Sequence, residues 1–201
     1  MCALSKLRRQ NHDIDKVLVM YGPPPMWLRE PGFASLLFTI LEQQVSLASA
    51  KAVYDRLCSI TNGLTPAAFL RHDDKTLRSI GFSRQKTQYC RIVAGAIIDG
   101  LLDLEQLELQ DDLTVETKLV AIKGIGPWTA AIYLLHSLGR PDIWPIGDLA
   151  LRIAVQEVAG LPSVPSEEKL QQIGESYRPW RSVAARVFWH NYLSKRNRKI
   201  I

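Results

Sequence analysis

Apolar residues recur at intervals of three and four along nearly the whole chain, and no segment alternates apolar and polar residues in the manner of a β-strand. An interval of three and four places apolar side chains on one face of an α-helix. The pattern therefore predicts an all-α protein of roughly ten helices. The clearest apolar stripes comprise Leu36, Leu37, Ile40 and Leu41; Ala50, Val53, Tyr54 and Leu57; and Ile92, Val93, Ala96 and Ile97.

Helix boundaries are marked by residues with known terminal preferences. Thr65, which precedes a proline, and Ser83 are typical of helix N-termini, where a side-chain oxygen accepts from the first N–H groups. Gly81, Gly100 and Gly139 stand where a helix C-terminus favours the left-handed conformation. Three later helices are predicted at about 148–159, 166–177 and 179–195.

The most informative segment is a glycine turn between two predicted helices. A helix over 115–122 ends at Lys123-Gly124-Ile125-Gly126, and a second begins at Pro127. Proline is tolerated at the first helical position because the first N–H groups of a helix have no partner within it. The glycines let the backbone approach another molecule closely. The N–H groups and positive dipole end of the second helix would suit an oxyanion such as a phosphate.

A single carboxylate, Asp148, follows this turn and precedes an apolar run. Each feature alone has a structural interpretation. A Gly-X-Gly turn often only connects helices, and such an Asp often only caps one. Their joint presence favours a phosphate-binding turn with an isolated catalytic acid, and Asp148 can serve as cap and acid together.

Composition is that of a folded protein with a modest excess of positive charge. Of the 201 residues, 47% are hydrophobic and 22% charged, which argues against a disordered chain. The net charge of +5 favours a polyanionic partner only weakly. No apolar run approaches the roughly 20 residues needed to span a bilayer, and the N-terminus lacks the apolar core of a signal peptide. We therefore expect no membrane association and no secretion, and a location in the cytoplasm with the nucleoid or in the nucleus.

Cysteine and histidine patterns indicate no catalytic cofactor. Cys2, Cys58 and Cys90 lie far apart in the sequence, so we expect free thiols, two of them packed in helices. Three cysteines cannot supply a four-cysteine iron–sulfur cluster. The four histidines form no i, i+4 pair of the kind that binds zinc.

Five segments together resemble a known family and cover about 33–193 of the chain, in the family's order. On these segments the chain resembles the helix-hairpin-helix DNA glycosylase superfamily and, within it, the 3-methyladenine DNA glycosylase II branch. The turn with its following Asp marks the superfamily; Trp128 and the Arg-Pro-Trp-Arg-Ser segment mark the branch. The segments are Leu41-Glu42-Gln43-Gln44-Val45-Ser46, Ile80-Gly81-Phe82-Ser83-Arg84-Gln85-Lys86, Ile122-Lys123-Gly124-Ile125-Gly126-Pro127-Trp128-Thr129-Ala130, Trp144-Pro145-Ile146-Gly147-Asp148-Leu149 and Tyr177-Arg178-Pro179-Trp180-Arg181-Ser182.

The resemblance implies a two-lobed helical fold with damaged double-stranded DNA bound across the cleft. One lobe would join 1–37 to 148–201, and the other would comprise 38–147 with the helix-hairpin-helix at 115–138. At this length we expect the compact form, without the additional N-terminal α/β domain of some members. A monomer is the default expectation.

The resemblance also implies a role for Asp148 as the catalytic carboxylate, which stabilises positive charge on the sugar as the base departs. Many members carry a second acid just before it, where this chain has Gly147. Trp128 stands where glycosylases that also cut the strand have a Schiff-base lysine. We therefore expect a monofunctional enzyme, with water as nucleophile and an abasic site as product.

The base pocket implied by the family contains Trp128 and Trp189, although either tryptophan could instead belong to the core. Alkylation makes a purine cationic, and electron-rich rings attract cations. At a further pocket position, Ile132 replaces an aromatic residue of some members. The sequence therefore leaves the accepted bases open among 3-methyladenine, 7-methylguanine, 1-methyladenine and hypoxanthine.

DNA contacts are implied for the hairpin and for two other segments. Gln44 stands where the family inserts a side chain into the gap left by the extruded nucleotide, with Gln43 or a residue of 80–86 as alternatives. Arg84 and Lys86 are either phosphate contacts or solvated charges at a helix start. The family often holds sodium or potassium on hairpin carbonyls, here those of Val120, Ile122 and Ile125. The implied hairpin contacts are Gly124, Ile125, Gly126 and Thr129.

Three functions remain open at this point. The first is excision of alkylated purines, and the second is excision of deaminated bases such as hypoxanthine. The third is a non-catalytic protein that uses the same hairpin to bind DNA. Asp148 discriminates the third function from the others, because a protein that only binds DNA needs no such carboxylate.

Overall fold

A computed structural model describes residues 3–197. Regular structure within them consists of thirteen α-helices without a strand, which confirms the predicted all-α class. The described chain forms two compact units, 3–28 with 139–197, and 29–138. Their boundaries fall at 28/29 and 138/139, whereas those expected from the sequence fall at 37/38 and 147/148. None of the helices in the described part of the chain is long and apolar enough to cross a membrane.

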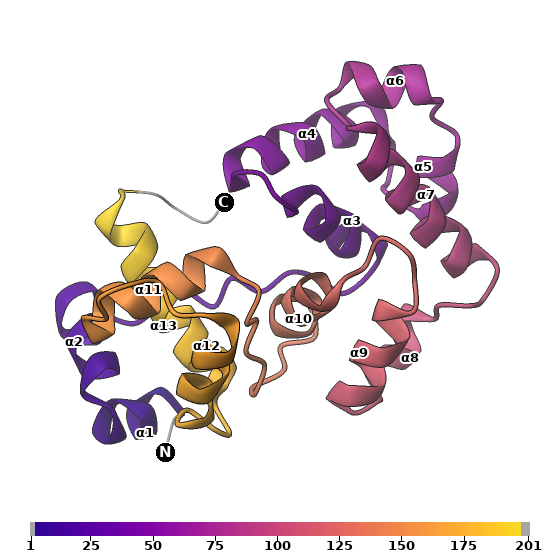
Figure 1. The fold of residues 1–201 in the computed structure, drawn as a ribbon. Helices are drawn as coiled ribbons and strands as arrows, with labels where there is room; N and C mark the ends of the chain where they lie inside the picture. Colours follow the sequence, from indigo (N-terminus) through magenta and orange to yellow (C-terminus); the bar gives the residue numbers. More distant parts are fainter. Residues whose placement is uncertain (1–2, 198–201) are drawn as a thin grey trace. The chain divides into compact units, whose positions relative to one another are not determined.

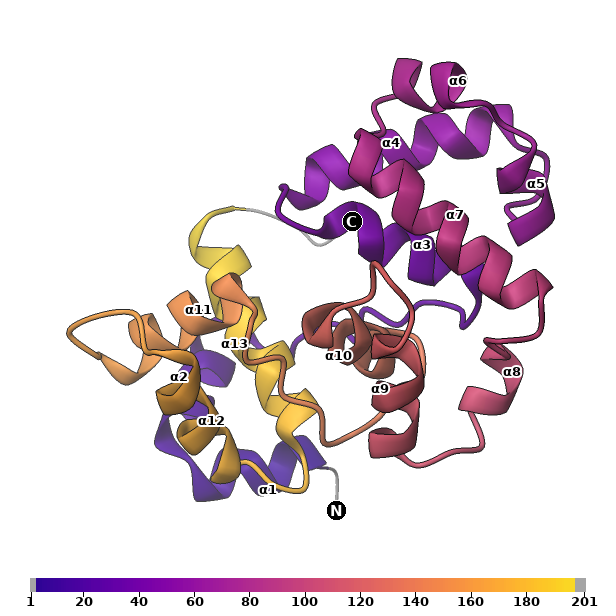
Figure 2. The ribbon, with the colours of Figure 1, turned by 45° about the vertical axis from the view of Figure 1, so that its right-hand side comes forward.

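The unit formed by 29–138 contains α3 (Phe33–Glu42), α4 (Leu47–Ile60), α5 (Pro66–Leu70), α6 (Asp74–Ser79), α7 (Arg84–Ile98), α8 (Leu104–Leu107), α9 (Asp112–Val120) and α10 (Pro127–His136). Helix α3 lies at its centre and contacts α4, α7 and α10 (Figure 2). The predicted stripe on α3 is fully buried, because this helix is covered by neighbours on several sides. Helices α9 and α10 pack together as the predicted helix-hairpin-helix.

The other unit contains α1 (Ala3–Gln10), α2 (His12–Tyr21), α11 (Leu149–Ala159), α12 (Glu167–Glu175) and α13 (Arg181–Lys195). Helix α13 packs against α1, α2 and α11 (Figure 1). Most of its residues are buried, including the polar Ser182, Arg186 and Asn191, so it is the central helix of this unit. Such a helix shows little amphipathic periodicity because nearly every face is covered.

The residues predicted to mark helix termini do so in the structure. Thr65 and Ser83 cap α5 and α7, each accepting a hydrogen bond from the backbone N–H three residues later. Gly81, Gly100 and Gly139 have positive φ angles of 104°, 71° and 64°. These residues therefore end or link helices in a conformation that suits glycine.

The helix count is somewhat higher than predicted, and one helix starts earlier than predicted. Residues 3–197 form thirteen helices rather than about ten, because short helices such as α6 and α8 contain too few residues for an apolar repeat to be seen. Helix α9 begins at Asp112 rather than at 115, because Asp111 caps it through Thr114 N–H. Of the cysteines, Cys90 is buried in α7 as predicted, but Cys58 is exposed on α4. Cys2 lies outside the described residues.

Candidate functional site

The turn between α9 and α10 depends on glycine at Gly124. Its φ is +104°, and an added Cβ would lie 2.5 Å from Cγ of Tyr89 on α7. The turn is closed by a 3.0 Å hydrogen bond from Ile125 N–H to the Ile122 carbonyl, and the Ile125 side chain is buried. Packing against α7 and burial of Ile125 therefore fix the conformation of this turn.

Gly126 has a different role from Gly124. It is the N-cap of α10, with φ of −93° and ψ of 175°, and an added Cβ there would meet nothing within 4 Å. Glycine carries no side-chain oxygen to accept from the first-turn N–H groups of α10, whose dipole is positive at this end. Gly126 thus leaves room for an anion at the helix N-terminus.

Gln43 and Gln44, adjacent at the end of α3, differ in what they contact. Gln43 donates from Nε2 to the carbonyl of Gly124 and to Oγ1 of Thr129, both at 2.9 Å. It therefore joins the end of α3 to the hairpin. Gln44 is exposed in the turn between α3 and α4, and its φ of +57° lies in the left-handed region. Of these two glutamines, Gln44 is the more exposed, and the choice among Gln44, Gln43 and a residue of 80–86 stays a prediction.

Three further residues predicted to contact DNA have different surroundings. The side chain of Thr129 is buried against Gln43, so its predicted contribution rests on its backbone. Lys86 donates from Nζ to the Leu41 carbonyl at 2.6 Å, and burial lowers the pKa of its ammonium. Arg84 is exposed in the first turn of α7. Lys86 therefore stabilises the end of α3 whether or not it also meets a phosphate.

Asp148 is both a helix cap and the acceptor of a second, distant donor. It is the N-cap of α11 and accepts from Leu151 N–H at 2.7 Å on Oδ1. The same oxygen accepts from the indole Nε1 of Trp189 on α13 at 3.0 Å. Two donors that converge on one carboxylate oxygen fix the rotation of the group. The structure thus brings together Asp148 and Trp189 within one unit.

The loop before Asp148 is anchored by Trp144, for which the sequence predicted no role. Trp144 is buried and donates from Nε1 to the Leu170 carbonyl at 2.9 Å. Its indole lies so close to α12 that a Cβ on Gly174 would fall 2.5 Å from Cδ1 and Nε1. The sequence contains one signal for this contact, which is Gly174 in the interior of the predicted helix 166–177. A glycine inside a helix often marks close packing against a neighbour.

The predicted base-pocket residues lie on two helices of different units. Trp128 is the half-buried second residue of α10, and Ile132 is buried one turn later. Trp189 is buried on α13, with its indole N–H directed to Asp148. Their contact with a flipped base stays a prediction.

No cluster of three or more His, Cys, Asp or Glu side chains placed to hold a metal occurs among residues 3–197. A monovalent ion at the hairpin would instead use carbonyl oxygens of Val120, Ile122 and Ile125. The Ile122 carbonyl lies on the inner side of the turn, where it accepts from Ile125 N–H. Carbonyl ligands leave no signal in side-chain identity, and the ion stays a prediction.

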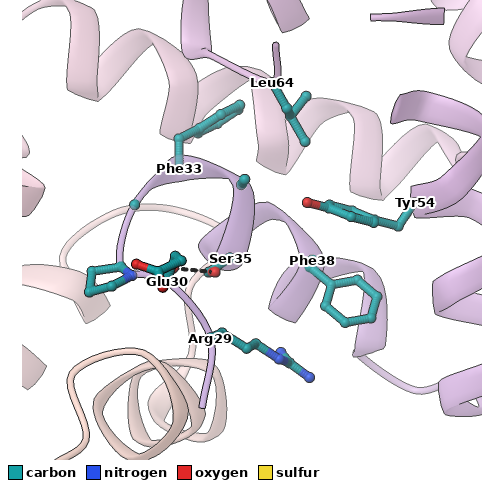
Figure 3. Close-up of a pocket in the computed structure, with 10 residues that line it drawn as sticks. Arg29, Glu30, Phe33, Ser35, Phe38, Tyr54 and Leu64 are labelled. Carbon is teal, nitrogen blue, oxygen red and sulfur yellow. Dashed lines mark hydrogen bonds between the residues drawn. The ribbon is translucent and has the colours of Figure 1, made fainter. Parts of the chain in front are cut away.

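A pocket of about 490 Å3 lies elsewhere in the 29–138 unit, at the start of α3. Figure 3 shows Phe33, Phe38, Tyr54 and Leu64 around it, with Arg29 beside Phe38. The Arg29 guanidinium is engaged by Glu42, at 2.6 Å and 2.9 Å. Neither Trp128 nor Ile132 lines this pocket, so it does not correspond to the predicted base pocket.

Comparison with known proteins gives concordant matches in sequence and structure. Residues 37–179 match the model of the HhH-GPD superfamily base excision DNA repair protein family. The chain is 30% identical over 178 residues to DNA-3-methyladenine glycosylase 1 of Schizosaccharomyces pombe, covering 87% of this chain and 78% of that protein.

Two solved structures extend this similarity to the fold. The 3-methyladenine DNA glycosylase of Schizosaccharomyces pombe in complex with abasic DNA matches with a TM-score of 0.87 at 28% identity, covering 93% of this chain and 94% of that chain. The DNA-3-methyladenine glycosidase of Bacillus halodurans matches with a TM-score of 0.79 at 30% identity, covering 98% and 92%. The similarity spans both units of the described chain.

Proposed function

The chain belongs to the HhH-GPD superfamily of base excision DNA repair proteins, and on that premise we propose that it is a monofunctional DNA glycosylase that excises alkylated purines. The observation that carries this proposal is Asp148, whose Oδ1 accepts from both Leu151 N–H and Trp189 Nε1. A carboxylate fixed in this way suits a reaction in which positive charge develops at a defined place.

Excision breaks the bond between the base nitrogen and the anomeric carbon of the sugar. As the base leaves with the bonding electrons, the sugar gains oxocarbenium character. The Asp148 carboxylate stabilises that charge, and a water molecule adds to the anomeric carbon through its oxygen and loses one proton to the surrounding solvent. The products are the free base and an abasic site, while the strand stays intact.

The monofunctional assignment rests on Trp128. An enzyme that cuts the strand by a Schiff base needs an amine next to the sugar, and an indole cannot form one. By the family resemblance, Trp128 occupies the position at which such enzymes carry lysine, and Lys123 precedes the two glycines on the other side of the turn. Breaks should therefore appear only when alkali cleaves the abasic site.

DNA binding is assigned to the hairpin and to the turn after α3. Gly126 leaves room at the N-terminus of α10, where backbone N–H groups and the helix dipole favour a phosphate. Gln44 is exposed on a turn that Gln43 ties to this same hairpin. We assign Gln44 to the gap left by the flipped nucleotide, where its amide can hydrogen-bond to the orphaned base.

The substrate class follows from charge and from the relatives. Electron-rich indoles favour a cationic purine by about 0.5–2 kcal/mol over a neutral one, and Trp128 offers such a ring. The similar proteins of Schizosaccharomyces pombe and Bacillus halodurans are named for 3-methyladenine. We therefore assign 3-methyladenine and 7-methylguanine as the preferred bases.

The proposal is tested by incubating the protein with methylated duplex DNA and, separately, with duplexes that contain hypoxanthine. Released bases are separated by chromatography, and strand breaks are scored with and without alkali. We expect free methylpurines, with breaks only after alkali. Release of hypoxanthine alone would show that the substrate is a deaminated base instead of an alkylated purine. Breaks without alkali would overturn the monofunctional assignment. Tight binding without any release would indicate a non-catalytic DNA-binding protein.

A further inference from the structure

Arg181 and Ser182, the first two residues of α13, hold the loop that leads to Asp148. We call residues 141–148 the Asp148 loop. Ser182 is fully buried; its Oγ accepts from Ile143 N–H at 2.8 Å and lies 3.3 Å from the Ile143 carbonyl. Its backbone N–H donates to the Pro141 carbonyl at 3.0 Å. One serine thus holds the loop backbone at two residues, Pro141 and Ile143.

Arg181 holds the residue between these two contacts. Its Nε and Nη2 donate to the two carboxylate oxygens of Asp142 at 2.9 Å and 3.0 Å, and Nη2 also donates to the Asp142 carbonyl at 2.7 Å. The Arg181 side chain is only 13% exposed. A bidentate pair that also reaches the backbone fixes direction as well as distance.

The other end of the Asp148 loop is held by the same helix. Asp148 N–H donates to the Pro145 carbonyl at 2.9 Å, and Trp189 Nε1 donates to the Asp148 side chain. Ser182 and Trp189 are seven residues apart on α13, which is about two helical turns and hence one face. One face of α13 therefore fixes the position of the first residues of the loop and the position of the Asp148 carboxylate at its end.

We propose that Arg181 and Ser182 are positioning residues for Asp148, which act by fixing the start of the Asp148 loop against α13. The proposal rests on the proposed function, in which Asp148 stabilises charge on the sugar. Charge stabilisation depends steeply on geometry, and a misplacement of about 1 Å can cost about 100-fold in rate. Loss of either contact should therefore weaken charge stabilisation more than DNA binding.

Two abasic-site analogues separate these effects without any need for turnover. A duplex with a pyrrolidine in place of the sugar carries a positive charge near the anomeric position, whereas a tetrahydrofuran duplex is neutral there. The ratio of their dissociation constants reports how well Asp148 faces the charge. We expect the wild-type protein to prefer the cationic duplex by at least about tenfold, on the scale of one well-placed charge contact.

The variants are Ser182→Ala and Arg181→Lys, each compared with wild type at the same salt concentration. We expect both to keep the affinity for the tetrahydrofuran duplex within about twofold and to lose most of the preference for the cationic duplex. Arg178→Gln is the matched control. Arg178 also reaches Asp142, at 2.8 Å, but its side chain is 49% exposed, so the preference should change by less than about twofold.

The outcomes distinguish the proposal from the function on which it rests. Equal wild-type affinities for the two duplexes would overturn the role of Asp148 itself. A wild-type preference that both variants retain would overturn the positioning role alone. A parallel loss of both affinities, with a lowered melting temperature, would show that Arg181 and Ser182 only support the fold. Arg181→Lys keeps the charge and a comparable side-chain length. If Ser182→Ala does not fold, the result for Arg181→Lys decides whether the positioning role holds.

Discussion

The indole N–H of Trp189 donates to Oδ1 of Asp148 at 3.0 Å, across 41 residues of sequence. Leu151 N–H reaches the same oxygen from the first turn of α11. The carboxylate is thus fixed by one local and one distant donor. Trp189, predicted as a wall of the base pocket, therefore also orients the group that we assign to catalysis.

Trp189→Phe tests this relationship because it keeps an aromatic ring but removes the N–H donor. We expect the single-turnover rate of base release to fall about tenfold, since a donor that orients Asp148 is lost. Trp180→Phe, at the N-cap of the same helix, should leave the rate within about twofold. An unchanged rate in Trp189→Phe would mean that the hydrogen bond has no part in catalysis.

Gly126→Asp should separate DNA binding from stability. Asp is a favourable N-cap, and the position has room for a side chain, so the melting temperature should be unchanged or slightly higher. The new carboxylate would accept hydrogen bonds from the N–H groups that we assign to phosphate binding, and its negative charge would repel a DNA phosphate. We expect affinity for any duplex to fall at least about tenfold.

Gly126→Asn is the neutral control for this change. Asn caps a helix as well as Asp does but carries no charge, so it should lose less affinity. Both affinities are measured by fluorescence anisotropy at the same salt concentration. Wild-type affinity in Gly126→Asp would exclude the N-terminus of α10 as a phosphate site.

Gln43→Glu and Gln44→Glu make the same change at adjacent residues and should have different consequences. At Gln43 the new carboxylate would face the Gly124 carbonyl, whose donor it removes. The free energy of unfolding, from urea denaturation, should fall by about 1–3 kcal/mol. At the exposed Gln44 it should change by less than about 0.5 kcal/mol. Equal effects would contradict the bridge between α3 and the hairpin.

Gly174→Ala should destabilise the protein although alanine is the better helix former. The new Cβ would lie 2.5 Å from the buried indole of Trp144, and such overpacking costs about 1–3 kcal/mol. Gly95→Ala on α7 is the matched control, since its Cβ would meet nothing within 4 Å and should stabilise the helix by about 0.5–1 kcal/mol. Thermal unfolding of both variants checks the pair, and similar shifts would contradict close packing at Gly174.

The parts of the site that sequence predicted are those with local signals. The hairpin was visible because glycine and proline have strong conformational preferences at fixed offsets. Asp148 was visible because a cap precedes an apolar helix. Both of these signals lie within a few residues of the feature that they mark, so no knowledge of tertiary structure was needed.

The remaining parts depend on packing between distant segments. The Gln43 amide meets Gly124 across 81 residues, and no local pattern encodes that pairing. Gln43 and Gln44 differ in features that no local pattern shows, namely the hydrogen bonds of Gln43 to the hairpin and the positive φ of Gln44. Trp189 looked like a pocket or core residue, since the direction of its N–H depends on how α11 and α13 pack.

The most direct test of the central claim compares Asp148→Asn with wild type on the same methylated duplex. Asn is nearly isosteric with Asp and is an equally good N-cap, so folding and duplex affinity should be retained. The lost charge should lower the single-turnover rate of methylpurine release by at least about 100-fold. Retained release, with the variant folded and bound to DNA, would contradict the assignment of Asp148 as the catalytic carboxylate.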